Sequence, residues 1–327
     1  MSSLSEHKIS TFNGFKTKWW ALNGHIHTVV ASQFSTIKDV DCSRVTISTP
    51  DSDFLEADLN ILNNDQPIVA LFHGLEGSSR RYYIRNLMWE LEKMGVSSAA
   101  MNFRGCGDEL NNQPRFYHSG ATDDYRVFFE YLSREFPGRP IYAIGFSLGA
   151  NALIKYLGEE EGQSVVMKAA AVSPPYDLRE GSLQLQEGIN HLYEVYFLRS
   201  LVDKLRRKKQ QYPDLPDFKG STLYDFDDTV TAPLHGFKDA DHYYETCSSK
   251  HFYGSIKTPT LIIHSKDDSL CPIAYAPETK ILENPFTEHL VTETGGHMGF
   301  LSSPDGWLNR TLLYWLGFTN TEHTQKN

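Results

Sequence analysis

Residues Gly145–Gly149 read GFSLG, so a serine lies between glycines two places before and two places after it. An apolar, strand-like run precedes Ser147, and a run of helix-forming residues follows it. This setting predicts a sharp turn between strand and helix that lifts the serine Oγ clear of a sheet. The glycines avoid clashes in the turn, and the new helix points free N–H groups at a reacting carbonyl. We therefore expect Ser147 to be a nucleophile.

A serine hydroxyl is a poor nucleophile without a base and an acid that orients the base. With this motif the expected chain order is Ser, then Asp or Glu, then His. His297 follows one strand-like run, and Asp267 and Asp268 follow another. We assign His297 as the base and Asp268 as its orienting acid, because the spacing from Asp268 to Pro272 fits the usual D-x-x-[VC]-P loop. Asp267 remains the rival.

An oxyanion formed during attack on a carbonyl needs two backbone N–H donors. Leu148, directly after the serine, should supply one of them. The loop His73–Ser79 (HGLEGSS) follows a third apolar run, and its histidine-glycine start places the N–H of Leu75 as the second donor. The expected site is thus Ser147, His297, Asp268 and the two leucine N–H groups.

The elements that must position these residues alternate between short apolar runs and amphipathic helices. This pattern predicts an α/β fold with a mostly parallel central sheet and helices on both faces. Ligand chemistry in such sheets gathers at the carboxyl ends of the strands. Strands are expected at 44–49, 54–62, 68–72, 97–103, 141–146, 167–172, 260–264 and 289–293, and helices at 80–94, 122–136, 148–157 and 306–316.

The alternation of strands and helices divides the chain into five segments. Residues 1–40 are expected to form an irregular leader, and residues 41–177 the first part of the α/β core. Residues 178–253 break the rhythm and are expected to be a helical lid, whose aromatic side chains suit either an acyl tunnel or packing within the lid. Residues 254–318 complete the core, and residues 319–327 form a flexible tail.

The composition of the chain limits which classes of partner and which cellular compartment are expected. The chain has 327 residues, and its 31 Lys and Arg against 41 Asp and Glu give a net charge of −10, which argues against nucleic acid. The basic run 206–209 is expected to be a solvated helix end. No apolar stretch is long enough for membrane insertion, and the simplest compartment is the cytoplasm.

Signatures of cofactor and metal sites are missing as well. Nucleotide-binding glycine patterns and HExxH do not occur, so no cofactor is expected. The four cysteines form no CxxC pair, and no metal is expected at His25 and His27. His118 and Asp123 have the HxxxxD spacing of certain acyltransferases, but we expect a helix start there. Cys106 is expected to be structural.

Together these strings resemble the α/β-hydrolase superfamily, in the YheT-like branch that also contains ABHD-type proteins and yeast medium-chain ethyl ester synthases. The segment Asn23–Thr28 (NGHIHT) is close to that branch's NPHLQT and departs from it at Gly24 and His27. The other matching strings are HGLEGSS (73–79), NFRGCG (102–107), YHSGATDD (117–124), GFSLGAN (145–151), TAPLHGF (231–237) and GGHMGF (295–300).

The resemblance implies a carboxylic ester hydrolase that acts on acyl esters, either short- to medium-chain esters or acylglycerols, without a cofactor. The partner is then a small-molecule acyl ester. One alternative is transfer of the acyl group to an alcohol, because water and alcohol compete for the same acyl-enzyme. A second alternative is a silent hydrolase fold used for binding. The oligomeric state stays open.

Overall fold

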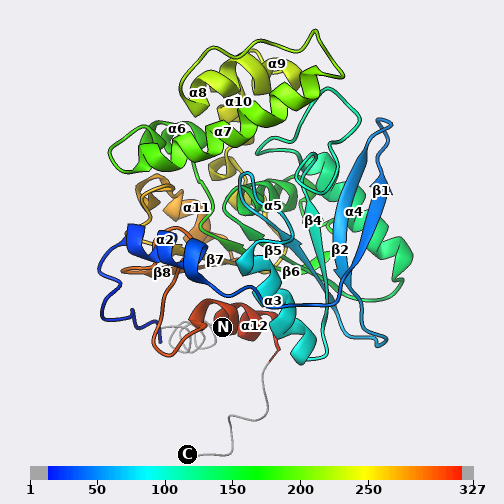
Figure 1. Ribbon diagram of the computed structural model, residues 1–327. Helices are drawn as coiled ribbons and strands as arrows, with labels where there is room; N and C mark the ends of the chain where they lie inside the picture. The colour runs from blue at the N-terminus through cyan, green and yellow to red at the C-terminus, as the bar shows by residue number, and fades with distance from the viewer. Residues whose placement is uncertain (1–13, 319–327) are drawn as a thin grey trace, which may run out of the picture.

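An eight-stranded sheet runs through the centre of the molecule (Figure 1), and the computed structural model describes residues 14–318. The strand order is β1-β2-β4-β3-β5-β6-β7-β8, with β1 and β2 antiparallel to their neighbours and the others parallel. The strands are β1 (Ser43–Ser48), β2 (Phe54–Asn60), β3 (Ile68–Phe72), β4 (Ser97–Asn102), β5 (Ile141–Phe146), β6 (Val166–Val172), β7 (Thr260–Ser265) and β8 (Thr287–Thr292). The expected mostly parallel α/β fold is confirmed.

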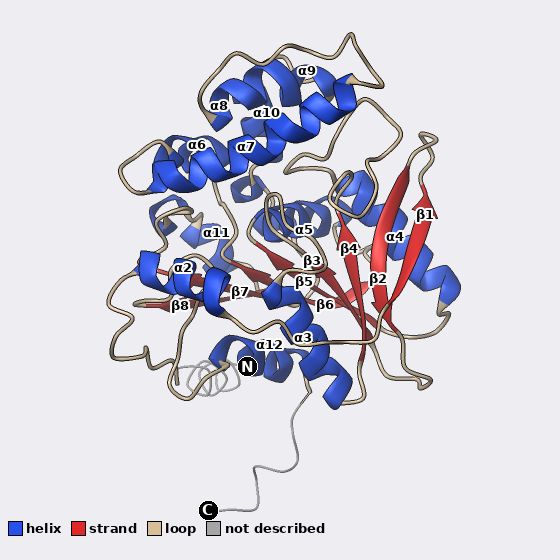
Figure 2. Cartoon of the chain, viewed as in Figure 1, coloured by secondary structure: helices blue, strands red, loops and turns tan. Residues whose placement is uncertain are grey.

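Helices cover both faces of the sheet (Figure 2). On one face the core includes α4 (Thr122–Glu135), α5 (Leu148–Glu160) and α11 (Glu278–Glu283), and on the other it includes α3 (Tyr82–Lys93) and α12 (Trp307–Leu316). Alternate residues of each central strand join opposite cores, as side chains in a strand must. In β3, for example, Ala70 and Phe72 pack on the α4 and α5 side, while Val69 and Leu71 pack on the other.

Helix α4 shows why the sequence folds in this way locally. Its buried Tyr125, Phe128, Phe129 and Leu132 recur at helical spacing and form one apolar face against the sheet. Two aspartates lie in its first turn, where the positive end of the helix dipole favours them. The HxxxxD segment therefore contains the helix start expected there.

A group of helices lies above the carboxyl edge of the sheet (Figure 1), and we call α6 to α10 the cap helices. They are α6 (Leu178–Leu185), α7 (Asn190–Lys209), α8 (Leu223–Phe226), α9 (Ala232–Leu234) and α10 (Ala240–Cys247), with a π-helical turn at Asp227–Thr231. The 3-10 turns Ser249–His251 and Tyr253–Ser255 follow α10, and a further 3-10 turn, Ile273–Tyr275, lies between β7 and α11. Two small apolar clusters of their own hold the cap helices together. None of the helices in residues 14–318 combines the length and apolar character that crossing a bilayer requires.

The leader differs from the sequence expectation. Helix α2 (Gly24–Phe34) begins where an irregular segment was predicted, with the Asn23 side chain accepting a hydrogen bond from the Ile26 N–H at its start. The helix buries Gly24, His27 and Ala31, which are small or polar, so its pattern carries no apolar period. The expectation of a flexible tail at 319–327 lies outside the described residues.

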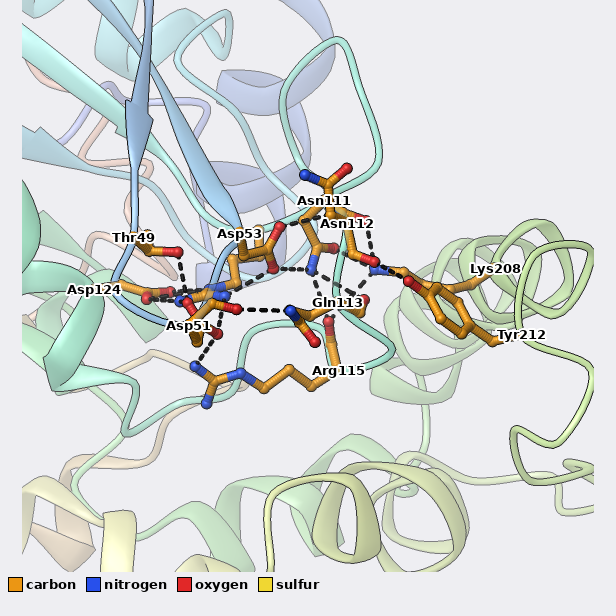
Figure 3. A network of polar contacts seen from close by, with 11 residues as sticks. Thr49, Asp51, Asp53, Asn111, Asn112, Gln113, Arg115, Asp124, Lys208 and Tyr212 are labelled. Atoms are coloured by element: carbon orange, nitrogen blue, oxygen red, sulfur yellow. Dashed lines mark hydrogen bonds and ion pairs between the residues drawn. The ribbon is translucent and has the colours of Figure 1, made fainter.

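A buried polar network joins four segments of the core (Figure 3). Arg104, after β4, is 3% exposed and binds Asp51 at 2.8 Å, Asp53 at 2.7 Å and Asp124 at 2.7 Å. Asn111 donates a hydrogen bond to Asp53 as well. The network thus fixes the turn between β1 and β2 against the start of α4.

The same network reaches the cap through helix α7 (Figure 3). The Lys208 ammonium donates to the Asn111 carbonyl at 2.9 Å and to its side-chain oxygen at 2.6 Å, and the Tyr212 hydroxyl donates to the Asn112 carbonyl. The expectation of a solvated basic run is therefore wrong for Lys208, which is 1% exposed. Its burial is possible because polar loop oxygens replace water around the ammonium.

Replacement of Arg104 by methionine should lower the free energy of unfolding by about 3–5 kcal/mol, because buried carboxylates lose their cation. Urea denaturation followed by circular dichroism measures the loss. Arg134→Met is the control, since the Arg134 side chain is 70% exposed and pairs with an exposed Glu135. Equal stability of the two variants would contradict the prediction.

Candidate active site

Ser147 lies at the turn between β5 and α5, with φ 53° and ψ −121°. A left-handed conformation is unusual for serine, and close backbone contacts enforce it here. A Cβ on Gly145 would lie 2.5 Å from the Gly149 carbonyl oxygen, and one on Gly149 would lie 2.5 Å from the His73 carbonyl oxygen. The Ser147 N–H donates to the Val172 carbonyl at 2.8 Å. The two glycines of GFSLG therefore permit a turn that leaves the serine half-buried at the sheet edge.

His297 comes from the loop after β8, and its Nε2 lies 2.8 Å from the Ser147 Oγ. On the other side of the ring, Nδ1 lies 2.9 Å from Asp268 Oδ2. Asp268, in the loop after β7, also accepts hydrogen bonds from the N–H groups of Leu270 and Cys271, both at 3.0 Å. The three side chains predicted from the sequence thus lie in one continuous hydrogen-bonded line.

Charge in this line is set by competition between burial and pairing. Burial opposes a negative charge on Asp268, but His297 and the backbone donors outweigh it, so the pKa of this carboxyl lies below its usual range. Burial also opposes a positive charge on His297, but Asp268 outweighs it and holds the pKa of the imidazole well above 6.5. When His297 is neutral, its Nδ1–H donates a hydrogen bond to the ionised Asp268, which leaves Nε2 as the acceptor that faces Ser147.

The two aspartates have different partners. Asp267 Oδ1 accepts a hydrogen bond from the Gly296 N–H at 2.9 Å, one residue before the histidine. Asp268 contacts the imidazole itself. Asp267, the rival acid, therefore binds the backbone of the loop that carries His297 and not the imidazole.

Leu148 and Leu75 flank the serine from two sides. Leu148 is the first residue of α5, so no carbonyl of its own helix can accept from its N–H. The peptide before Leu75 is fixed through its carbonyl, because Gly74 O accepts from the Gly77 N–H at 3.0 Å and contacts His73 Nδ1 at 2.7 Å. A planar trans peptide points its N–H opposite to its C=O, so the Leu75 N–H must face away from these partners.

His73 is a support for this loop and not a second base. Burial lowers the pKa of its imidazole to about 4, so the ring is neutral. Its Nε2 accepts from the Phe103 N–H at 3.1 Å, which leaves the proton on Nδ1 to be donated to Gly74 O.

The sequence reasoning missed helix α2, which braces the histidine loop. The Thr28 Oγ accepts from the His297 N–H at 2.9 Å and donates to the Gly24 carbonyl at 2.8 Å. The buried His27 accepts from the Leu301 N–H at 2.9 Å. A Cβ on Gly24 would lie 1.9 Å from the Asp267 carbonyl oxygen, so the start of α2 presses directly on the loop of the acid. The signal in the sequence that could have pointed to a role for this segment was the string NGHIHT at Asn23–Thr28.

Two cavities meet at the reacting atoms, since Ser147, His297 and Leu75 line both. The larger, of about 880 Å³, opens between α2, α7 and the loop after β3, and Arg81, Lys204 and Tyr193 contribute to its wall. The smaller, of about 130 Å³, lies under the cap helices. Its wall includes the apolar side chains Leu178, Leu185, Phe197, Leu201, Leu223 and Leu270.

The remaining candidates lie apart from this line. His25 stacks on Tyr193, whereas His27 contacts the Thr17 hydroxyl, so the two rings have separate partners. His118 lines the smaller cavity, and its ring lies 4.4 Å from the ring of His235 at an interplanar angle of 58°. Cys106 lies 3.3 Å from the Lys204 ammonium, and burial raises the pKa of its thiol to about 11. Within residues 14–318, Asp268, Cys271 and His297 form the one group of side chains close enough to share a metal. Asp268 and His297 already bind each other there.

Replacement of Thr28 by valine should lower kcat for ester hydrolysis by about 10- to 100-fold, because a small displacement of a positioned base is costly. The hydroxyl that holds the His297 backbone is lost, while the shape of the side chain is kept. Ser32→Ala is the control, since that hydroxyl bonds the Val29 carbonyl of the same helix. Steady-state rates on p-nitrophenyl butyrate test this, and an unchanged kcat in the Thr28 variant would remove α2 from the site.

Comparison with known proteins shows where the chain belongs. Residues 67–304 match the protein family described as alpha/beta hydrolase fold. The chain is 34% identical over 307 residues to the putative esterase YheT of Escherichia coli, with 90% of each chain covered. It is 32% identical to the monoacylglycerol lipase of Saccharomyces cerevisiae over 81% of this chain, and it spans 62% of that relative's length.

Among solved structures, an esterase of Pyrococcus furiosus shares the fold, with a TM-score of 0.59 at 20% identity over 85% of this chain and 91% of the other. The sequence match to the family model covers most of the sheet and the loops that hold Ser147, Asp268 and His297. The chain therefore belongs to the α/β-hydrolase family, in its YheT-like branch.

Proposed function

We propose that the protein is a serine hydrolase of carboxylic acyl esters that works through an acyl-enzyme. The observation that carries the proposal is the line from Ser147 Oγ to His297 Nε2 at 2.8 Å and from His297 Nδ1 to Asp268 at 2.9 Å. The names of the two relatives, an esterase and a monoacylglycerol lipase, support the same class of reaction.

In the proposed reaction His297 takes the proton from Ser147 as Oγ attacks the ester carbonyl. The electron pair of the C=O bond moves to oxygen, and the N–H groups of Leu75 and Leu148 hold the resulting oxyanion. Collapse of this intermediate expels the alcohol, which takes its proton from His297. Water then attacks the acyl-enzyme in the same way and releases the acid. Asp268 keeps the imidazole in the correct tautomer throughout.

The two cavities suggest how the ester is divided between its halves. The smaller cavity under the cap is walled by leucine and phenylalanine side chains, which suit a short acyl chain. The larger cavity has charged and hydroxyl-bearing side chains in its wall, which suit the alcohol half. Both cavities reach Ser147, so the scissile carbonyl lies where they join.

Replacement of Ser147 by alanine should lower hydrolysis of p-nitrophenyl butyrate by at least about 1,000-fold, because water is then the one remaining nucleophile. Labelling by a fluorophosphonate should vanish as well, while the melting temperature stays near that of the wild type. Retained hydrolysis in the alanine variant would exclude this serine. A wild type that neither hydrolyses esters nor takes the label would favour a silent binding protein.

The pH dependence follows from the pair His297 and Asp268. Neutral His297 is the active form, and its raised pKa means that the proton leaves only at higher pH. The profile of kcat/KM should therefore fall with decreasing pH through a midpoint above 6.5. Asp268→Asn should lower that midpoint, because burial then acts without the carboxylate. An unchanged midpoint in the Asp268→Asn variant would show that Asp268 does not set the pKa of His297.

A further inference from the structure

We propose that helix α7 of the cap holds the oxyanion loop in its working shape through the ion pair between Lys204 and Glu76. Lys204 is then a positioning residue, because it acts on Leu75 through the neighbouring Glu76. The inference rests on the proposed function, in which the Leu75 N–H binds the oxyanion. It adds a dependence of catalysis on how the cap is seated.

Glu76 occupies a turn position that normally belongs to glycine or asparagine. The hydrogen bond from the Gly77 N–H to the Gly74 carbonyl closes a four-residue turn with Leu75 and Glu76 at its centre, and Glu76 has φ 49°. A side chain in this left-handed region costs about 1–2 kcal/mol. A glycine would avoid the cost, so the carboxylate must be held by contacts that offset it.

Every polar group of Glu76 has a partner. Its N–H donates to the Tyr117 hydroxyl at 2.9 Å, and its carbonyl accepts from Arg81 at 2.9 Å. The Tyr117 hydroxyl donates to the carboxylate at 2.8 Å. The core thus supplies the contacts to the backbone of the turn and one contact to the carboxylate.

Helix α7 supplies the charged contact to the carboxylate. The Lys204 ammonium lies 2.6 Å from Oε1, and the Ser200 hydroxyl, one turn earlier, donates to Oε2. The side chains of Glu76 and Lys204 are 3% and 8% exposed, so little water reaches either charged group while the pair is intact. Burial opposes the charge on Glu76, but Lys204 outweighs it and keeps the pKa of the carboxyl below its ordinary value.

Loss of the ammonium would leave a buried carboxylate without a cation. The least costly response is for Glu76 to turn toward the larger cavity, which both residues line. Leu75 and Glu76 share one tight turn, so such a movement must rotate the peptide that carries the Leu75 N–H. The expected damage is therefore to the transition state, where the oxyanion exists, and not to substrate binding.

Lys208 provides a matched control one helical turn further along α7. It is also buried and also joins the cap to the core, but its partner is Asn111 in the loop after β4. Removal of either ammonium weakens the contact between the cap and the core. Only removal of the Lys204 ammonium is expected to disturb the oxyanion loop as well.

The experiment compares Lys204→Met and Lys208→Met with the wild type on p-nitrophenyl butyrate. It also measures inhibition by a trifluoromethyl ketone. Ser147 Oγ adds to the carbonyl of this ketone, His297 takes the proton, and the C=O electron pair becomes an oxyanion in the same hole. Lys204→Met should lower kcat at least about 10-fold and weaken the inhibitor by a similar factor, while KM changes less than about twofold. Lys208→Met should keep kcat within about threefold of the wild type.

Two results would overturn the inference: an unchanged kcat in Lys204→Met, or an equal loss of kcat in both variants, which would indicate general loosening of the cap. If Lys204→Met does not fold, the double variant Glu76→Gln with Lys204→Met is measured instead, since it leaves no buried charge. In the double variant the left-handed turn still loses its contact with α7, so kcat and inhibitor binding should fall by a common factor while KM changes less. If the wild type shows no ester hydrolysis that Ser147→Ala abolishes, the proposed function itself is wrong. If the wild type is active, the comparison of the two lysine variants tests the inference about the cap alone.

Discussion

The hydrogen bond between His297 and Asp268 is the contact on which the arrangement of the site depends. It joins the loops after β7 and β8, and it decides which nitrogen of the imidazole faces Ser147. A buried carboxylate and a buried imidazole each carry a cost, and each is stable because it lies beside the other. The adjacent parallel strands β7 and β8 end at the same edge of the sheet, so the sheet brings the two loops together without a long excursion of either.

Around this contact, three supports fix backbone rather than side chains. Asp267 holds the Gly296 N–H, Thr28 holds the His297 N–H, and His73 holds the Gly74 carbonyl. Each acts on a peptide in or beside a proposed catalytic loop, and together they limit how far the proposed base and the proposed oxyanion donors can move. The supports come from the β7 loop, helix α2 and the end of β3, so the precision of the site depends on segments far apart in the sequence. Preorganisation of this kind avoids reorganisation during the reaction.

The cap is joined to the core by polar contacts that are buried as thoroughly as the apolar ones. Lys204 reaches the oxyanion loop and Lys208 reaches the loop after β4, from successive turns of α7. Such contacts are directional, whereas apolar packing tolerates sliding. The cap covers the smaller cavity, and the larger cavity lies between α7 and α2. Helix α7 therefore borders both cavities and also contacts the loop after β3.

The sequence determined the sheet and the order of its elements, and it singled out Ser147, Asp268 and His297, which the structure joins by hydrogen bonds, because local patterns carry that information. Apolar runs of strand length, the glycines of the turn and the proline after Asp268 all lie close in the chain to what they specify. Helix α2 was not predicted, because it buries small and polar residues against a loop some 270 positions away, as the contact between Thr28 and His297 shows. Only the tertiary structure decided that Lys208 is buried, that Asp267 holds backbone, and that Glu76 meets Lys204. Each of these depends on a partner supplied by a distant segment, and no local pattern encodes such a partner.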